Sequence, residues 1–172
     1  MNLKIGLLAG LFSLPVLVSA QTSQGAKSRQ ADSSSASASI VIHQEVDYTV
    51  SPNRLYEVLL STKKFREMTS LLSGFTATSA TIDSALGGAC SVFDGHIVAR
   101  NVELVPNKRI VQAWRVVTWP EGVWSIARFE FRQQGNGTHL VFDHIGFPEG
   151  LREHLTDGWK EHYFDALRKY VK

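Results

Sequence analysis

Alternation with a period of two residues is the sequence feature that most restricts the fold. From residue 42 to residue 50, every second side chain falls on one side of an extended chain, and these are Ile42, Gln44, Val46, Tyr48 and Val50. The residues between them are polar. The pattern returns in two later segments, with Ser125, Ala127, Phe129 and Phe131 on one face, and with Leu140, Phe142 and His144 in a similar set. Such alternation predicts half-buried strands of an antiparallel sheet.

Turn-forming residues separate the predicted strands at short, regular intervals. They are Gly87-Gly88, Gly95, Pro106-Asn107, Pro120-Glu121-Gly122 and Gly135-Asn136-Gly137. This spacing predicts a meander of adjacent strands. Asn136 also starts an acceptor pattern for N-glycosylation, but we favour a tight hairpin alone, because Asn and Gly accept positive φ.

Two helical segments accompany the strands. Ser51 and Pro52 supply an N-cap and a proline at the first helical position, and they predict a short helix after the first strand. Near the other end, Phe147-Pro148 ends the last strand. A helical stripe follows, made of Leu155, Trp159, Tyr163, Ala166 and Tyr170. The predicted class is α+β, with a curved antiparallel sheet wrapped around a long C-terminal helix.

The first 20 residues have the layout of a signal peptide. Lys4 precedes an apolar stretch, and the segment ends in Val18-Ser19-Ala20. We predict cleavage after Ala20 and a secreted or periplasmic location. The stretch is shorter than the roughly 20 apolar residues of a membrane span, so we expect no stable membrane insertion after cleavage, although an uncleaved anchor is the alternative. Residues 21–39 are rich in serine and predict a flexible linker, which leaves 40–172 as one folded domain.

Charge and cysteine content exclude several classes of function. The 18 basic and 16 acidic residues are interspersed, whereas nucleic-acid binding proteins usually cluster their basic residues. Cys90 is the only cysteine, so no intramolecular disulfide can form, and the spacings of zinc sites are missing. No nucleotide or cofactor fingerprint is present. We therefore expect no nucleic acid, no metal and no cofactor.

A series of short motifs occurs in the order of a known family. The motifs are Gly87-Gly88, Asp94-Gly95, Leu104-Val105-Pro106-Asn107-Lys108, Trp114-Arg115, Trp119-Pro120-Glu121-Gly122, Gly137-Thr138, Gly146-Phe147-Pro148, Gly158-Trp159 and Tyr163-Phe164. In this order they resemble the C-terminal domain of activators of the heat-shock-protein-90 ATPase, from Ile40 to Val171.

The resemblance implies a helix-grip fold of the superfamily that includes START lipid-transfer domains, polyketide cyclases and birch-pollen-type allergens. In that superfamily a hydrophobic cavity lies between the sheet and the long helix. The resemblance does not carry over co-chaperone activity, because the activators use a separate N-terminal domain for stimulation. The predicted export also argues against a chaperone partner, because an exported protein and a cytosolic chaperone are on opposite sides of a membrane. We expect an exported binder of a hydrophobic or amphipathic small molecule.

The candidate ligand-binding residues are those predicted to face the space between sheet and helix: Trp114, Phe129, Phe142, His144, Trp159 and Tyr163. Trp114, Trp159 and Tyr163 have large rings with one polar group each, and they suit either pocket walls or core packing. His144 suits a ligand contact, an acid or base, or a core histidine satisfied by one internal hydrogen bond. Cys90 is expected to pack in the core.

Two other functions stay open. One is an enzyme of the cyclase, dehydratase or hydrolase kind that uses His144 as acid or base in the cavity. The other is an interaction module that keeps the partner-binding surface of the activators. No catalytic motif favours the enzyme.

Overall fold

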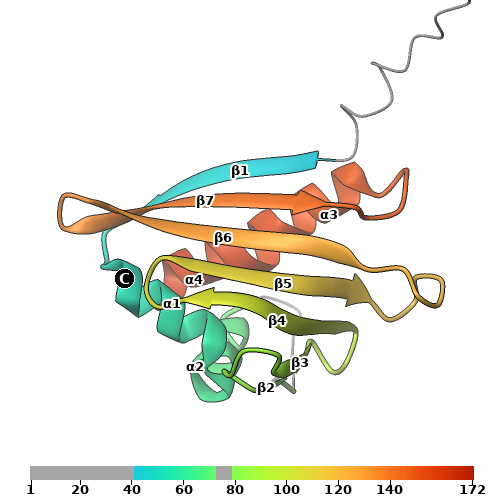
Figure 1. Ribbon diagram of the computed structural model, residues 1–172. Coiled ribbons are helices and arrows are strands. Elements are labelled where there is room, and N and C mark those ends of the chain that lie inside the picture. The colour runs from blue at the N-terminus through green and yellow to red at the C-terminus, as the bar shows by residue number, and fades with distance from the viewer. Residues whose placement is uncertain (1–40, 73–78) are drawn as a thin grey trace, which may run out of the picture. The chain divides into compact units, whose positions relative to one another are not determined.

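The computed structural model describes residues 41–72 and 79–172, which form one seven-stranded sheet with helices on one of its faces (Figure 1). The predicted signal peptide (1–20) and linker (21–39) lie outside the described residues. No helix in the described part is long and apolar enough to cross a membrane.

The sheet follows the predicted antiparallel order. Its strands are β1 (Val41–Tyr48), β2 (Thr81–Ile82), β3 (Ala89–Val92), β4 (Ile97–Val105), β5 (Arg109–Val116), β6 (Ser125–Gln134) and β7 (Gly137–Ile145). Their order across the sheet is β1-β7-β6-β5-β4-β3-β2, so β2 to β7 are a meander and β1 joins its far edge. The α+β class with a curved antiparallel sheet and a C-terminal helix is confirmed.

Two short helices connect β1 to the meander, where the sequence predicted one. Helix α1 (Pro52–Leu60) begins at the predicted proline, but the Ser51 side chain makes no capping hydrogen bond. The Ser51 carbonyl instead accepts from the Arg54 backbone N–H at 3.0 Å. Helix α2 (Thr62–Thr69) follows at once, because the Ser61 hydroxyl accepts from the Lys64 backbone N–H and starts a second helix.

The C-terminal helical run has three consecutive segments. Helix α3 (Arg152–Gly158) leads into the π-helical turn η2 (Trp159–Phe164) and then into α4 (Asp165–Tyr170). The predicted apolar stripe faces the sheet: Leu155, Trp159, Tyr163 and Ala166 are buried. The π turn was not predicted, because apolar spacing does not distinguish it from an α turn.

The core lies between the inner face of the sheet and this helical run. Phe129 and Phe142 are cross-strand partners on β6 and β7, with ring centroids 4.9 Å apart. Both contact Trp159, and Phe142 also contacts Phe164. Burying side chains of this size stabilises a fold by about 1.5–3 kcal/mol each. These aromatic contacts hold the helix against the sheet.

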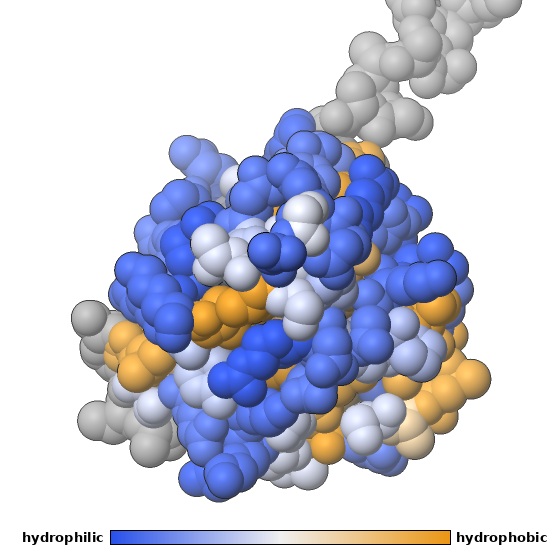
Figure 2. Space-filling view, turned by 90° about the vertical axis from the view of Figure 1, so that its left-hand side faces the viewer, coloured by the Kyte–Doolittle hydropathy of each residue, from blue (hydrophilic) through white to orange (hydrophobic). Residues whose placement is uncertain are grey.

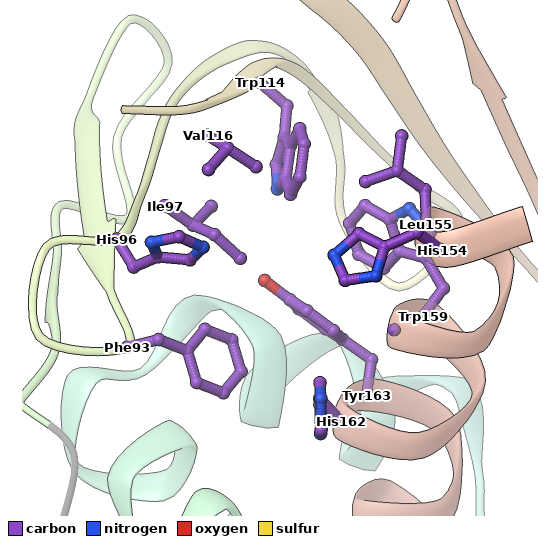
Figure 3. Close-up of a pocket in the computed structure, with 11 residues that line it drawn as sticks. Phe93, His96, Ile97, Trp114, Val116, His154, Leu155, Trp159, His162 and Tyr163 are labelled. Carbon is purple, nitrogen blue, oxygen red and sulfur yellow. The ribbon is translucent and has the colours of Figure 1, made fainter. Parts of the chain in front are cut away.

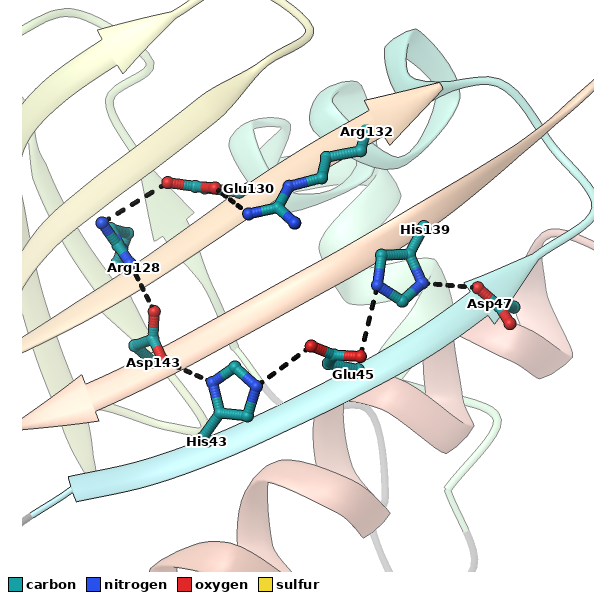
Figure 4. Close-up of polar contacts among 8 residues, drawn as sticks. All are labelled: His43, Glu45, Asp47, Arg128, Glu130, Arg132, His139 and Asp143. Carbon is teal, nitrogen blue, oxygen red and sulfur yellow. Dashed lines mark hydrogen bonds and ion pairs between the residues drawn. The ribbon is translucent and has the colours of Figure 1, made fainter. Parts of the chain in front are cut away.

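The outer face of the sheet is polar. His43 on β1 has its Nδ1 atom 2.7 Å from an Asp143 carboxylate oxygen and its Nε2 atom 3.1 Å from Glu45. Arg128 donates to the other Asp143 oxygen at 2.6 Å. We call the connected set the outer-face network (Figure 4), and its members are His43, Glu45, Asp47, Arg128, Glu130, Arg132, His139 and Asp143. The predicted alternation is therefore observed, with the polar side chains turned to solvent.

The face seen in Figure 2 shows the same division of side chains. Hydrophilic residues cover most of that face, and hydrophobic ones come to the surface in a few separate areas. The apolar side chains of the strands and helices are mostly inside.

Candidate functional site

A cavity of about 220 Å³ lies between the strands β4 and β5 and the C-terminal helical run (Figure 3). Its apolar lining comes from the β3–β4 loop, from the two strands, and from α3 and η2: Phe93, Ile97, Trp114, Val116, Leu155 and Trp159. Its remaining lining residues are Gly158, Tyr163 and three histidines, His96, His154 and His162. The cavity is thus mainly hydrophobic with a few polar groups, which is typical of small-molecule sites.

Aromatic rings in mutual contact form the walls. The ring centroids of Trp114 and Trp159 are 5.3 Å apart, and those of Trp159 and Tyr163 are 4.4 Å apart. Phe93 adds an edge-to-face contact to Tyr163 at 5.6 Å. These ring-to-ring contacts brace the pocket walls against one another.

The π turn positions two of these rings. A π turn has i→i+5 hydrogen bonds and holds more residues than an α turn, so it changes the direction in which the following side chains point. Trp159 and Tyr163 are four apart, and both face the cavity from η2. Phe164, at the end of the same turn, packs in the core against Phe142. The turn therefore divides its aromatic side chains between the pocket and the core.

Phe93 reaches the pocket from a strained loop. Its φ of 52° is in the left-handed region, which is unusual for a bulky residue, and Asp94 follows at 57°. The loop is held because an Asp94 carboxylate oxygen accepts from the Ser79 backbone N–H at 2.6 Å. Strained backbone of this kind occurs preferentially at ligand and active sites.

Two polar groups that face the pocket can donate hydrogen bonds. The Trp114 indole Nε1 is buried and has no hydrogen-bond partner among the described atoms. The Tyr163 hydroxyl points into the cavity (Figure 3), and burial raises the pKa of that phenol, so it keeps its proton. The described residues that line the cavity include no Lys, Arg, Asp or Glu.

His144 lies behind the pocket wall rather than in the pocket. Trp159 Nε1–H donates to His144 Nδ1 at 2.9 Å, which assigns the proton to Nε2. The Nε2–H then donates to Ser125 Oγ at 2.7 Å, and the Ser125 hydroxyl donates to the Trp114 carbonyl at 2.8 Å. Burial lowers the pKa of His144 to about 3. With both nitrogens engaged and a neutral ring, His144 has the geometry of a core histidine, satisfied by two hydrogen bonds rather than one.

The six predicted site residues divide into two groups. Trp114, Trp159 and Tyr163 line the cavity. Phe129, Phe142 and His144 do not, although each contacts Trp159, so they support the wall from behind. Strand alternation gave the correct face for these three residues but could not show that the Trp159 indole covers them.

Several lining residues were missed by the sequence reasoning. Phe93 and His96 belong to a turn that the sequence marked only by Asp94-Gly95, Ile97 begins β4, and Val116 ends β5. His154 and His162, on the C-terminal helical run, were also not predicted as pocket residues. The available signal was that His154 and Gly158 directly precede Leu155 and Trp159 of the predicted helical stripe.

Cys90 and the potential metal ligands were the other reactive groups considered from the sequence. Cys90 is buried as expected, and burial raises the pKa of its thiol to about 11. Its sulfur lies 3.8 Å from the Gln112 side-chain nitrogen and 3.9 Å from Asn101 Oδ1, and neither amide is a general base. Within 41–72 and 79–172, no group of three His, Cys, Asp or Glu side chains is arranged to hold a metal ion.

Known proteins share this fold. An HSP90 activator from Plasmodium falciparum superimposes with a TM-score of 0.70 at 21% sequence identity, covering 77% of this chain and 96% of the other. CalU16 from Micromonospora echinospora gives a TM-score of 0.62 at 17% identity, covering 77% and 76% of the two chains. These TM-scores establish a common fold.

Sequence relatives are more specific. The chain is 30% identical over 122 residues to the human activator of 90 kDa heat shock protein ATPase homolog 1, covering 71% of this chain and 34% of the human protein. It is 29% identical over 123 residues to the Dictyostelium discoideum activator, covering 71% and 30%. The chain thus spans about a third of the length of these relatives. The family model described as "Activator of Hsp90 ATPase homolog 1-like protein" matches residues 49–172, and the chain belongs to this family.

Proposed function

We propose that this protein binds a hydrophobic or amphipathic small molecule in the pocket between its sheet and its C-terminal helix. The observation that carries the proposal is the cavity of about 220 Å³ with braced aromatic walls. An apolar cavity of about 150 Å³ in a well-packed protein is large enough for benzene. The present cavity is larger and has polar groups that can orient a guest.

Gly158 supports the proposal independently. It lies inside the C-terminal helical run, where glycine is unfavourable relative to alanine by roughly 0.5–1 kcal/mol. A Cβ atom at this position would meet no heavy atom within 4 Å, so packing does not require glycine. Gly158 lines the cavity, and the missing side chain keeps the pocket open.

This placement provides a test with a matched control. The substitution Gly158→Leu should fill the pocket and weaken binding of the fluorescent apolar probe 1-aminoanthracene by roughly tenfold or more. Gly158→Ala adds one methyl group and a better helix former, so it should keep the binding and the thermal stability. Equal probe affinity in the wild type and Gly158→Leu, with both folded, would place the probe elsewhere and remove the support for this pocket.

Native mass spectrometry of protein purified from its own host tests whether a natural ligand is bound. We expect a bound mass that disappears on denaturation and is reduced in Gly158→Leu. If the polypeptide mass alone is found, and the probe does not bind either, the proposal is refuted.

Family membership favours a second candidate, an interaction with a chaperone. The relatives are named activators of the 90 kDa heat shock protein ATPase, and this chain matches about a third of their length. The check is the ATPase rate of a 90 kDa heat shock protein with and without the purified protein. A dose-dependent increase supports the second candidate, whereas an unchanged rate counts against it.

We also propose that the protein acts outside the cytoplasm, on the strength of the signal-peptide pattern in residues 1–20. The small-molecule proposal does not depend on this location, whereas contact with a cytosolic chaperone would. The two questions can therefore be tested separately.

A further inference from the structure

The Trp114 indole N–H is a buried donor that faces the pocket without a partner. The side chain is only 3% exposed, and its Nε1 makes no hydrogen bond to the described part of the chain. Trp159, which lies against it, uses its own N–H on His144. Buried donors in folded proteins nearly always have a partner. An acceptor atom that enters the pocket would supply the missing partner.

The Tyr163 hydroxyl lies close to the same point. Figure 3 shows the phenol oxygen pointing toward Trp114 and Ile97 across the middle of the cavity. The Trp114 N–H acts to lower the pKa of this phenol, although burial has the larger, raising effect. The two groups are thus neighbours, yet the indole N–H forms no proper hydrogen bond to the phenol. One acceptor atom between them could receive both hydrogens.

The lining favours an uncharged acceptor. No lysine or arginine is among the described lining residues, so a carboxylate bound at Trp114 would lose its hydration without a compensating cation. Of the three histidines, His96 and His154 are exposed to solvent and His162 is partly exposed. A charged group of a ligand near the exposed histidines would be stabilised by water, and not by the Trp114 and Tyr163 donors. A carbonyl or ether oxygen suits the interior.

The walls favour a flat, cyclic guest. Trp114, Trp159, Tyr163 and Phe93 present rigid ring surfaces, and ring-to-ring contacts are favourable in offset and edge-to-face geometries. The volume of about 220 Å³ exceeds that of a benzene-binding cavity of about 150 Å³ by enough for a second fused ring.

We propose, building on the small-molecule function above, that the natural guest is an uncharged one- or two-ring compound with a carbonyl-type oxygen. That oxygen accepts hydrogen bonds from Trp114 Nε1–H and from the Tyr163 hydroxyl, while the rings lie between Trp159 and Phe93. The two donors then select oxygenated rings over plain hydrocarbons.

A pair of probes of matched shape tests this selection. Titration calorimetry of the full chain compares 1-tetralone, which has a ketone oxygen, with tetralin, which lacks it. We expect tetralone to bind roughly tenfold more tightly, the value of one or two buried hydrogen bonds. Tyr163→Phe should reduce this preference and Trp114→Phe should reduce it further. Trp124→Phe, at a tryptophan that does not line the pocket, should leave it unchanged.

The outcomes separate this inference from the broader proposal. If tetralone and tetralin bind equally well, the donor pair is not used and the inference fails, while the pocket proposal stands. If neither probe binds, both fail. If 5,6,7,8-tetrahydronaphthalene-1-carboxylate binds as tightly as tetralone, the preference for an uncharged oxygen is wrong.

A second measurement covers the case in which Trp114→Phe is unfolded. In the wild type, the proton NMR signal of the Trp114 indole N–H should move downfield on adding tetralone and not on adding tetralin. An unmoved signal with saturating tetralone would overturn the proposed hydrogen bond.

Discussion

At the scale of single residues, His144 stabilises the fold through hydrogen bonds, although the sequence also suggested it as an acid or base. It is fully buried, accepts from one indole and donates to one hydroxyl, and is neutral. An acid or base needs contact with a substrate, and the pocket is on the other side of Trp159. The histidine instead fixes the Trp159 ring that forms the pocket wall.

Replacing His144 by leucine should change the pH dependence of stability. The folded-state pKa of about 3 is below the ordinary value of 6.5, so the unfolded chain binds the extra proton and the wild type loses stability as pH falls from about 6.5 toward 3. His144→Leu lacks this loss. At pH 7.5 it should be less stable by about 1–3 kcal/mol, because Trp159 loses its acceptor. Urea unfolding at several pH values checks this, and parallel curves for the two proteins would contradict it.

The outer-face network gives a second prediction for a single residue. Hydrogen bonds to Asp143 and to Glu45 raise the pKa of His43, so its favourable charge is present at low pH and is lost as the pH rises through that value. Asp143→Asn should lower the pKa of His43 toward the ordinary 6.5. An NMR titration of the imidazole measures it. Asp47→Asn, which removes a partner of His139 instead, is the control and should not move the His43 titration.

At the scale of elements, the hairpin between β6 and β7 shows what its glycines do. Gly135 has a φ of 57°, while Asn136 is not among the residues with positive φ, so the two-residue loop has the pattern of a type II′ turn. Gly137 has another role, since a Cβ there would lie 2.2 Å from the Tyr48 carbonyl oxygen. Its missing side chain lets the end of β1 approach β7.

The two glycines should therefore respond differently to substitution. Gly137→Ala forces the Tyr48 backbone to move and should lower the free energy of unfolding by about 1–3 kcal/mol. Gly135→Asn meets no atom within 4 Å, so only the strain of a side chain at positive φ opposes it, and it should cost about 1 kcal/mol, less than Gly137→Ala. Chemical denaturation ranks the variants. A Gly135→Asn variant that is the less stable of the two would show that turn conformation, not close approach, dominates here.

At the scale of the whole molecule, one sheet serves two purposes. Its inner face packs on the helical run through β6 and β7, while near β4 and β5 the side chains leave the cavity open. The sequence around this domain predicts export, and the family fold is retained from residue 49 to residue 172. A secreted or periplasmic binder would meet its guest outside the cytoplasm.

The export proposal has a direct check. Protein recovered from the culture medium or periplasm of its host should have an intact mass that begins at Gln21, because cleavage is predicted after Ala20. Replacing Ala20 by a bulky residue such as Phe should slow the cleavage, whereas Ala26→Phe in the predicted linker should not. Full-length protein found only in the cytoplasm would refute export.

The sequence by itself determined the antiparallel meander, the first helix, the C-terminal stripe and the family. These depend on local patterns: alternation places Ile42 and Phe129 inside, and Pro52 begins a helix. Such patterns also identified Trp114, Trp159 and Tyr163 as inward aromatic residues. The reason is that a strand or helix period fixes which side of an element a residue faces.

Only the tertiary structure decided which inward residues meet empty space. The period of a strand gives a direction but not what lies in that direction, so Trp114 next to the cavity and His144 behind Trp159 have the same sequence signature. The pocket is lined by side chains that lie as far apart in the sequence as Phe93 and Tyr163. It depends on the π turn, on the strained loop at Phe93 and on the absence of a side chain at Gly158. Packing over long sequence distances set these features, and no local pattern encodes them.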